Sequence, residues 1–196
     1  MRPGAVVFDF DGTLIDTREI KTANYVTAFE SVFSLSPGER QRVVDSCIRT
    51  SGANRFVQLR DTLDELRRSA TPAQEQEWSR LYSDLNAGSA GRIREFPSVR
   101  PLLRELRSLG YRVCAASGIL EEEFRRELDR RELIGLFDEV RGGDKPGFLR
   151  GLRERGAGVL FVGDTEYDRV AADQAGVGFF MVRDDRDLQA LGARLR

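Results

Sequence analysis

The second half of the sequence alternates between short apolar runs and amphipathic segments, and this alternation constrains the fold more than any other feature. The runs that predict strands lie at residues 111–116, 137–140, 159–162 and 178–182. The segments that predict helices lie at residues 99–109, 119–131, 147–155, 167–175 and 185–195. Strands that alternate with helices form parallel β-α-β units with right-handed crossovers. The sequence therefore predicts an α/β fold, a doubly wound, Rossmann-like parallel sheet with helices on both faces.

One more strand of this sheet is predicted near the start of the chain. The run from Ala5 to Phe8 is apolar throughout, as in a strand that is buried on both faces. Asp9 and Asp11 follow it, and Gly12 then marks a change of chain direction. Two carboxylates about 4 Å apart repel by roughly 1 to 4 kcal/mol, so a shared proton or a divalent cation must offset the repulsion. Taken alone, the stretch is also compatible with a plain Asp/Gly turn after a strand.

The segment between this strand and the rest of the sheet has a different pattern. Residues 16–94 read as roughly four amphipathic helices without a strand. The stretch at residues 87–91 contains glycine and serine and could act as a hinge or linker. We therefore expect an α/β core formed by residues 1–15 and 95–196, with an all-α domain of residues 16–94 inserted into it.

Composition restricts the chemistry that is open to the chain. The sequence contains no histidine, which excludes histidine acid–base catalysis, histidine-containing triads and histidine metal ligands. Proton transfer must then fall to carboxylate, lysine, tyrosine or cysteine side chains. A metal site would have to be rich in oxygen ligands, which favours Mg²⁺ over Zn²⁺.

Charge and cysteine content restrict the partners and the location. The formal net charge of −1 gives no electrostatic reason to expect nucleic acid or an anionic membrane as a partner. The apolar runs are shorter than a membrane span. The two cysteines, Cys47 and Cys114, do not suggest a disulfide framework. These features predict a cytoplasmic protein.

Polar residues follow the ends of four predicted strands. In chain order they are Asp9, Asp11 and Thr13, then Ser117 and Gly118, then Lys145, and finally Asp164, Thr165 and Asp168. The carboxyl ends of parallel strands meet at one edge of a doubly wound sheet, where such folds bind ligands. Lys145 is one of only two lysines among 31 basic residues, so an ammonium group is specifically indicated there. Carboxylates hold divalent cations, whereas lysine side chains and helix N-termini bind phosphoryl oxygens. This combination therefore predicts a site for Mg²⁺ and a phosphate.

The same residues resemble the motifs of haloacid dehalogenase (HAD) superfamily hydrolases. The resemblance is to the branch with a helical cap after the first strand, which includes phosphoglycolate phosphatases and β-phosphoglucomutase-like phosphatases. It rests on DFDGTL at residues 9–14, AASG ending at Ser117-Gly118, Lys145-Pro146, and GDTEYD at residues 163–168. It covers nearly the whole chain and implies an HAD-like core with residues 16–94 as the cap. The segment before Lys145 is shorter than is usual in the family, which leaves the placement of this lysine open.

The resemblance implies a role for each aspartate. Asp9 would attack phosphorus and form an aspartyl-phosphate. Asp11 would protonate the leaving oxygen and then activate the hydrolytic water. Asp9 and Asp164, together with the backbone carbonyl of Asp11, would hold Mg²⁺, while Asp168 would orient a metal-bound water.

The resemblance also implies the phosphate-binding residues. Ser117, with Gly118 and Thr13, would bind the phosphoryl group. Lys145 would neutralise the negative charge that spreads over the phosphoryl oxygens in the transition state. Ser117-Gly118 could instead be only a strand-to-helix cap, and Lys145 a surface lysine.

The resemblance also implies that the cap selects the substrate, because in relatives the loop between the first cap helices faces the active site. Arg49 or Arg55, in and beside the loop that follows the second predicted cap helix, could hold a carboxylate or a second phosphate, although solvated arginines are equally compatible with the sequence. A small cap favours a small phosphorylated metabolite. The predicted function is a Mg²⁺-dependent phosphatase that acts through an aspartyl-phosphate. A phosphomutase acting on a sugar phosphate and a non-catalytic binding protein on the same fold are the alternatives. The natural substrate and the oligomeric state stay open.

Overall fold

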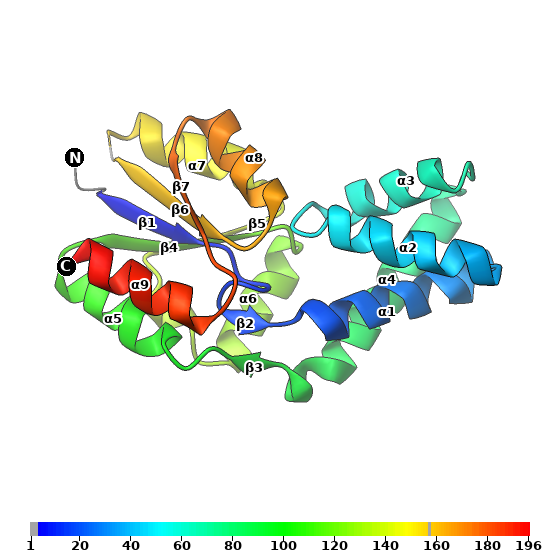
Figure 1. Cartoon of the computed structure of the whole chain (residues 1–196), viewed down its shortest axis with the longest axis horizontal. Helices are drawn as coiled ribbons and strands as arrows, with labels where there is room; N and C mark the ends of the chain where they lie inside the picture. Colours follow the sequence, from blue (N-terminus) through cyan, green and yellow to red (C-terminus); the bar gives the residue numbers. More distant parts are fainter. Residues whose placement is uncertain (1–3, 157) are drawn as a thin grey trace. The chain divides into compact units, whose positions relative to one another are not determined.

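A computed structural model of the chain describes residues 4–156 and 158–196 (Figure 1). The chain divides into two compact units, Met1–Asp16 with Glu95–Arg196, and Thr17–Arg94. We call the first unit the core and the second the cap. Relative to the predicted domains, the first boundary lies one residue later and the second lies at the same place.

The core contains a five-stranded sheet with the order β5-β4-β1-β6-β7, in which every neighbouring pair is parallel. Its strands are β1 (Ala5–Phe8), β4 (Arg112–Ser117), β5 (Glu139–Gly142), β6 (Val159–Gly163) and β7 (Gly178–Met181). The four residues of β1 are fully buried, which explains their uninterrupted apolar character. The strand order reverses beside β1, and the carboxyl ends of strands at such a point border the ligand-binding crevice of doubly wound folds. The predicted fold class is confirmed.

Helices cover both faces of this sheet (Figure 1). They are α5 (Val99–Ser108), α6 (Glu121–Arg130), α7 (Lys145–Glu154), α8 (Glu166–Ala175) and α9 (Asp185–Leu195), with a short 3-10 turn η2 (Ile134–Leu136). One face of the sheet packs Val7, Cys114 and Phe161 against buried side chains of α7 and α8. Helices α5 and α9 pack against each other on the opposite face. This arrangement is the three-layer packing expected of a doubly wound sheet.

The cap is formed by helices packed around aromatic side chains. They are α1 (Arg18–Phe33), α2 (Pro37–Arg49), α3 (Arg55–Glu65) and α4 (Pro72–Ser89), followed by a short 3-10 turn η1 (Ala90–Arg92). Tyr25 and Phe29 of α1 and Trp78 of α4 are fully buried in one cluster. Across the ranges that the structure describes, no helix has both the length and the apolar character needed to cross a membrane.

Some element boundaries differ from the prediction. The second strand of the second half was expected at residues 137–140, but Cys114 pairs with Glu139 and the strand runs to Gly142. The apolar side chain of Phe137 suggested the earlier start, although this residue is buried outside the sheet. The short strands β2 (Ile15–Asp16) and β3 (Arg94–Glu95) pair with each other and were not predicted, since two residues carry no periodic pattern.

Candidate active site

Asp9 lies at the carboxyl end of the central strand β1, directly after its last paired residue. Its backbone N–H donates to the carbonyl of Val162 in β6 at 2.8 Å, which holds the residue against the sheet. The side chain is buried, with 2% of its residue surface exposed, and its Oδ1 lies 2.7 Å from Nζ of Lys145. A buried carboxylate therefore faces an ammonium group at the edge of the sheet where ligands are expected.

Lys145 is the first residue of α7, and its Nζ bridges two carboxylates. The distance to Asp9 Oδ1 and to Asp168 Oδ1 is 2.7 Å in each case. Burial by itself would lower the pKa of Lys145, but the charges of Asp168 and Asp9 outweigh it and hold the pKa above its usual range. Because β5 ends at Gly142, only two residues separate the strand from this helix, and the short segment still brings the lysine to Asp9.

Asp164 follows β6 and lies against the turn after Asp9. Thr13 Oγ1 donates to Asp164 Oδ1 at 3.4 Å. Gly12 has φ of +75°, and a Cβ at this position would lie only 2.1 Å from Asp164 Oδ2. Asp11 is partly buried in the same turn, where it forms a backbone bridge with Ile15. The Asp-Gly-Thr turn therefore needs a glycine both for its left-handed backbone and for the close approach of this carboxylate.

Asp168 is fully buried in the first turn of α8 and uses its two oxygens differently. Oδ1 accepts from Lys145 at 2.7 Å. Oδ2 accepts from the Thr165 hydroxyl at 2.6 Å and from the Thr165 backbone N–H at 3.1 Å. The sequence placed both Thr165 and Asp168 among the polar residues at this strand end, but it assigned a role only to Asp168, because Thr165 has the spacing of an ordinary helix cap.

The carboxylates of Asp9, Asp164 and Asp168 form a cluster in which one oxygen of each lies within 4.8 Å of the others. If all are ionised, these groups and Lys145 carry a net charge of −2. Burial raises the pKa of Asp9 well above its usual value; Lys145 opposes this shift, and the charges of Asp168 and Asp164 add to it. A divalent cation would offset the excess charge, and the oxygen-only donors fit a hard cation. The residues present could therefore hold a metal.

This cluster overlaps with the predicted metal ligands without being identical to them. Asp9 and Asp164 belong to both sets. Within the described parts of the chain, the third carboxylate of the cluster is Asp168, whereas the expected contribution of Asp11 is its backbone carbonyl. Both oxygens of Asp168 already accept hydrogen bonds, which is compatible with an indirect contact to a cation. The individual ligand assignments stay predictions.

Comparison with known proteins places the chain in a family. Residues 6–182 match the model of the family described as haloacid dehalogenase-like hydrolase. The chain belongs to this family. It is 29% identical to a phosphoglycolate phosphatase of Cereibacter sphaeroides, covering 90% of this chain and 83% of that protein. It is 28% identical to a phosphoglycolate phosphatase of Aquifex aeolicus, covering 87% of this chain and 80% of that protein.

Solved structures agree with this HAD-like fold. The crystal structure of a hydrolase from Pseudomonas syringae superimposes with a TM-score of 0.78 at 21% identity, covering 95% of this chain and 90% of that one. At this level of identity the likeness concerns the fold alone. It extends over the core and the cap, since nearly the whole of each chain is covered.

Two of the predicted phosphate-binding residues of this HAD-like hydrolase, Ser117 and Gly118, lie at the end of β4. Ser117 is buried and lies two residues beyond Ala115, which pairs with Phe8 of β1. Its Oγ accepts from the N–H of Ile119 at 3.2 Å, which shapes the turn that contains Gly118. Both residues therefore lie at the same edge of the sheet as Asp9, and their contact with phosphate stays a prediction.

The turn after Ser117 is held from the neighbouring strand. Glu121, the first residue of α6, accepts a hydrogen bond from the backbone N–H of Gly142 at 2.5 Å. A Cβ on Gly142 would lie 2.5 Å from the Glu121 Cα, so a larger residue would displace the turn. The Glu121 carboxylate therefore fixes the turn.

The two candidate specificity residues have partners within the cap. Arg55 is 6% exposed, its Nη1 donates to Ser83 Oγ at 2.5 Å, and its guanidinium lies 5.7 Å from the centre of the Tyr82 ring. Arg49 forms an ion pair with Glu65 at 2.9 Å. These contacts give both arginines a structural role in the cap. Their role in substrate recognition stays a prediction.

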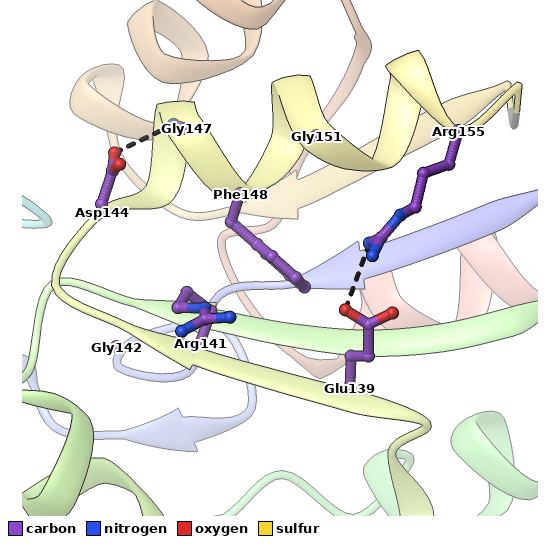
Figure 2. A pocket seen from close by; sticks show the side chains of 8 residues that line it. All are labelled: Glu139, Arg141, Gly142, Asp144, Gly147, Phe148, Gly151 and Arg155. Atoms are coloured by element: carbon purple, nitrogen blue, oxygen red, sulfur yellow. Dashed lines mark hydrogen bonds and ion pairs between the residues drawn. The ribbon is translucent and has the colours of Figure 1, made fainter.

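A pocket of about 640 Å³ lies between β5 and α7 (Figure 2). Arg155 reaches Glu139 across it at 3.2 Å, and the Arg141 guanidinium lies 6.0 Å from the Phe148 ring. Its remaining lining residues are Gly142, Asp144, Gly147 and Gly151. The pocket contains none of the predicted site residues, so it is distinct from the carboxylate cluster.

Proposed function

We propose that this HAD-like hydrolase is a phosphatase that cleaves a small phosphorylated metabolite, with Asp9 as the nucleophile. One observation carries the proposal: the Asp9 carboxylate is buried at the sheet edge, 2.7 Å from Lys145 and within 4.8 Å of Asp164 and Asp168. An anionic nucleophile that attacks an anionic phosphate needs positive charge close by. Lys145 supplies part of it, and the carboxylate cluster supplies a place for a cation.

The cation that suits this site is Mg²⁺. Asp9, Asp164 and the backbone carbonyl of Asp11 would hold it directly, and Asp168 would contact it through water. When bound, Mg²⁺ supplies positive charge that stabilises the phosphoryl oxygens in the transition state. An oxygen-only site in a chain without histidine supports Mg²⁺ rather than Zn²⁺.

The chemistry of the chain's own residues proceeds in two steps. In the first, a carboxylate oxygen of Asp9 attacks phosphorus, the bond from phosphorus to the ester oxygen breaks, and Asp11 gives its proton to the leaving oxygen. In the second, Asp11 takes a proton from water, which attacks phosphorus and releases phosphate and the Asp9 carboxylate. Lys145 balances charge on the phosphoryl oxygens in both steps and favours the ionised form of Asp9 between turnovers.

The names of the relatives suggest the substrates to test first. Two of them are phosphoglycolate phosphatases, so 2-phosphoglycolate is the first candidate. At 28–29% identity the substrate does not transfer by similarity alone, and a panel of small phosphorylated acids and sugars is needed. The predicted phosphomutase alternative would convert a sugar phosphate without net release of phosphate.

The test is release of inorganic phosphate from p-nitrophenyl phosphate and from this panel, with Mg²⁺ or with a chelator. Asp9→Asn keeps the shape of the side chain and removes the nucleophile. Asp84→Asn, at a position 64% exposed in the cap, is the matched control. We expect phosphate release by the wild type and by Asp84→Asn with Mg²⁺ only, and none by Asp9→Asn. Equal rates for the wild type and Asp9→Asn would disprove the proposal.

A further inference from the structure

Thr165 lies between the end of β6 and the start of α8, where it is the residue that caps the helix. Its Oγ1 accepts a hydrogen bond from the backbone N–H of Asp168 at 3.1 Å. The single hydroxyl hydrogen is then free to point at Asp168 Oδ2, which lies 2.6 Å away. The backbone N–H of Thr165 donates to the same oxygen at 3.1 Å. Among residues 4–156 and 158–196, Thr165 therefore supplies both donors to this oxygen.

These bonds fix the orientation of the Asp168 carboxylate. With Oδ2 held by Thr165, Oδ1 points to Lys145 Nζ at 2.7 Å, and the same Nζ lies 2.7 Å from Asp9 Oδ1. The carboxylate is also packed closely against β6, because a Cβ on Gly163 would lie 2.5 Å from the Asp168 Cβ. A continuous series of polar contacts thus runs from the Thr165 hydroxyl through Asp168 and Lys145 to Asp9.

We infer that Thr165 is a positioning residue, whose hydroxyl orients Asp168 so that the Lys145 ammonium is held against Asp9. Its effect on turnover rests on the proposed function, because only then does the position of Lys145 at Asp9 matter for a reaction. The series of contacts itself does not depend on that proposal. All of its members are buried or partly buried, so solvent screens these interactions little.

The cap contains a natural control for this role. Thr71 begins α4 with the same reciprocal pattern, accepting from Gln74 N at 3.3 Å and donating from its own N–H to Gln74 Oε1 at 3.0 Å. These bonds are exposed, and in the part of the chain that the structure describes neither residue contacts a buried charge. Loss of either hydroxyl removes a helix cap, but only loss of the Thr165 hydroxyl releases a carboxylate that holds Lys145.

The experiment compares Thr165→Val, Thr165→Ser and Thr71→Val. Valine keeps the shape of threonine and the backbone donor but removes the hydroxyl. We expect the two valine variants to lose similar thermal stability. Thr165→Val should lower kcat by about tenfold or more, equivalent to about 1.4 kcal/mol, with little change in KM. Thr165→Ser should recover most of this loss, and Thr71→Val should keep the wild-type kcat. The inference fails if Thr165→Val keeps the wild-type kcat or if Thr165→Ser is as impaired as Thr165→Val.

A second readout follows Lys145 without turnover. The chain has only two lysines, so ¹⁵N-lysine labelling gives two side-chain ammonium signals, which Lys21→Arg assigns. Thr165→Val should shift or broaden the Lys145 signal, and Thr71→Val should leave it unchanged. A wild type that releases no phosphate removes the proposed function, and the ammonium signal then decides the positioning role. A lower kcat with an unchanged Lys145 signal would contradict the path through Lys145.

Discussion

The Gly12→Ala substitution tests whether the turn after β1 sets the position of the Asp164 carboxylate. Gly12 has φ of +75°, where any residue with a Cβ is strained by about 1–2 kcal/mol. The added Cβ would also lie 2.1 Å from Asp164 Oδ2, whereas ordinary contacts begin at 3.4 Å. The carboxylate must therefore move by roughly 1.3 Å, and a displacement of about 1 Å near reacting atoms can cost on the order of 100-fold in rate.

A matched glycine separates these two effects. Gly110 has φ of +83°, but a Cβ there would meet no atom within 4 Å. Gly110→Ala therefore carries the backbone strain without the displacement of a carboxylate. We expect both variants to lose stability, by roughly 2–8 °C in Tm for about 1–2 kcal/mol. Only Gly12→Ala should lose activity, by on the order of 100-fold.

The assays are thermal unfolding followed by circular dichroism and release of phosphate from p-nitrophenyl phosphate with Mg²⁺. The comparison of interest is the rate of Gly12→Ala against that of Gly110→Ala at a temperature where both are folded. Rates for the two variants within a few-fold of each other would refute the reasoning, because they would show that the site tolerates displacement of Asp164.

Two further outcomes follow from buried groups. Burial raises the pKa of Cys47 to about 12 and that of Cys114 to about 11, so both thiols stay protonated at pH 8. They should react with a thiol reagent such as Ellman's reagent only after denaturation. Rapid labelling of the native protein at pH 8 would contradict this expectation. Lys145→Met leaves two buried carboxylates without their shared cation and should lower the free energy of unfolding by about 3–5 kcal/mol in urea titrations, whereas Lys21→Arg should leave it nearly unchanged. A Lys145→Met variant as stable as the wild type would mean that this ion pair contributes little in the folded state.

The positions of the site residues could be predicted because they depend on local patterns. An apolar run followed by Asp9 predicts a buried strand that ends in a carboxylate, and the alternation of strands and helices determines at which edge the strand ends meet. The same reasoning was less reliable for β5, since Phe137 is apolar but does not pair in the sheet. The register in which a strand pairs depends on the neighbouring strand, so the sequence of one segment alone does not specify the register.

The partners of each site residue could not be predicted in the same way. The spacing of Thr165 and Asp168 is that of a helix cap, and a cap needs no other part of the chain. The Asp168 carboxylate nevertheless meets Lys145, which lies 23 residues earlier in the sequence. These two side chains meet because α7 and α8 pack on the same face of the sheet.

The contacts at the start of α8 show how a local rule and the fold can determine one side chain together. The capping hydrogen bonds at the start of α8 orient Asp168 Oδ2 toward Thr165, whichever residue lies beside the other carboxylate oxygen. Helix packing then places the Lys145 ammonium group 2.7 Å from the remaining oxygen, and the sheet places Asp9 Oδ1 2.7 Å from the same ammonium. Because these contacts form one series, the loss of one should loosen the next without unfolding the core. A substitution of Thr165, at the N-terminus of α8, should therefore change turnover more than it changes stability.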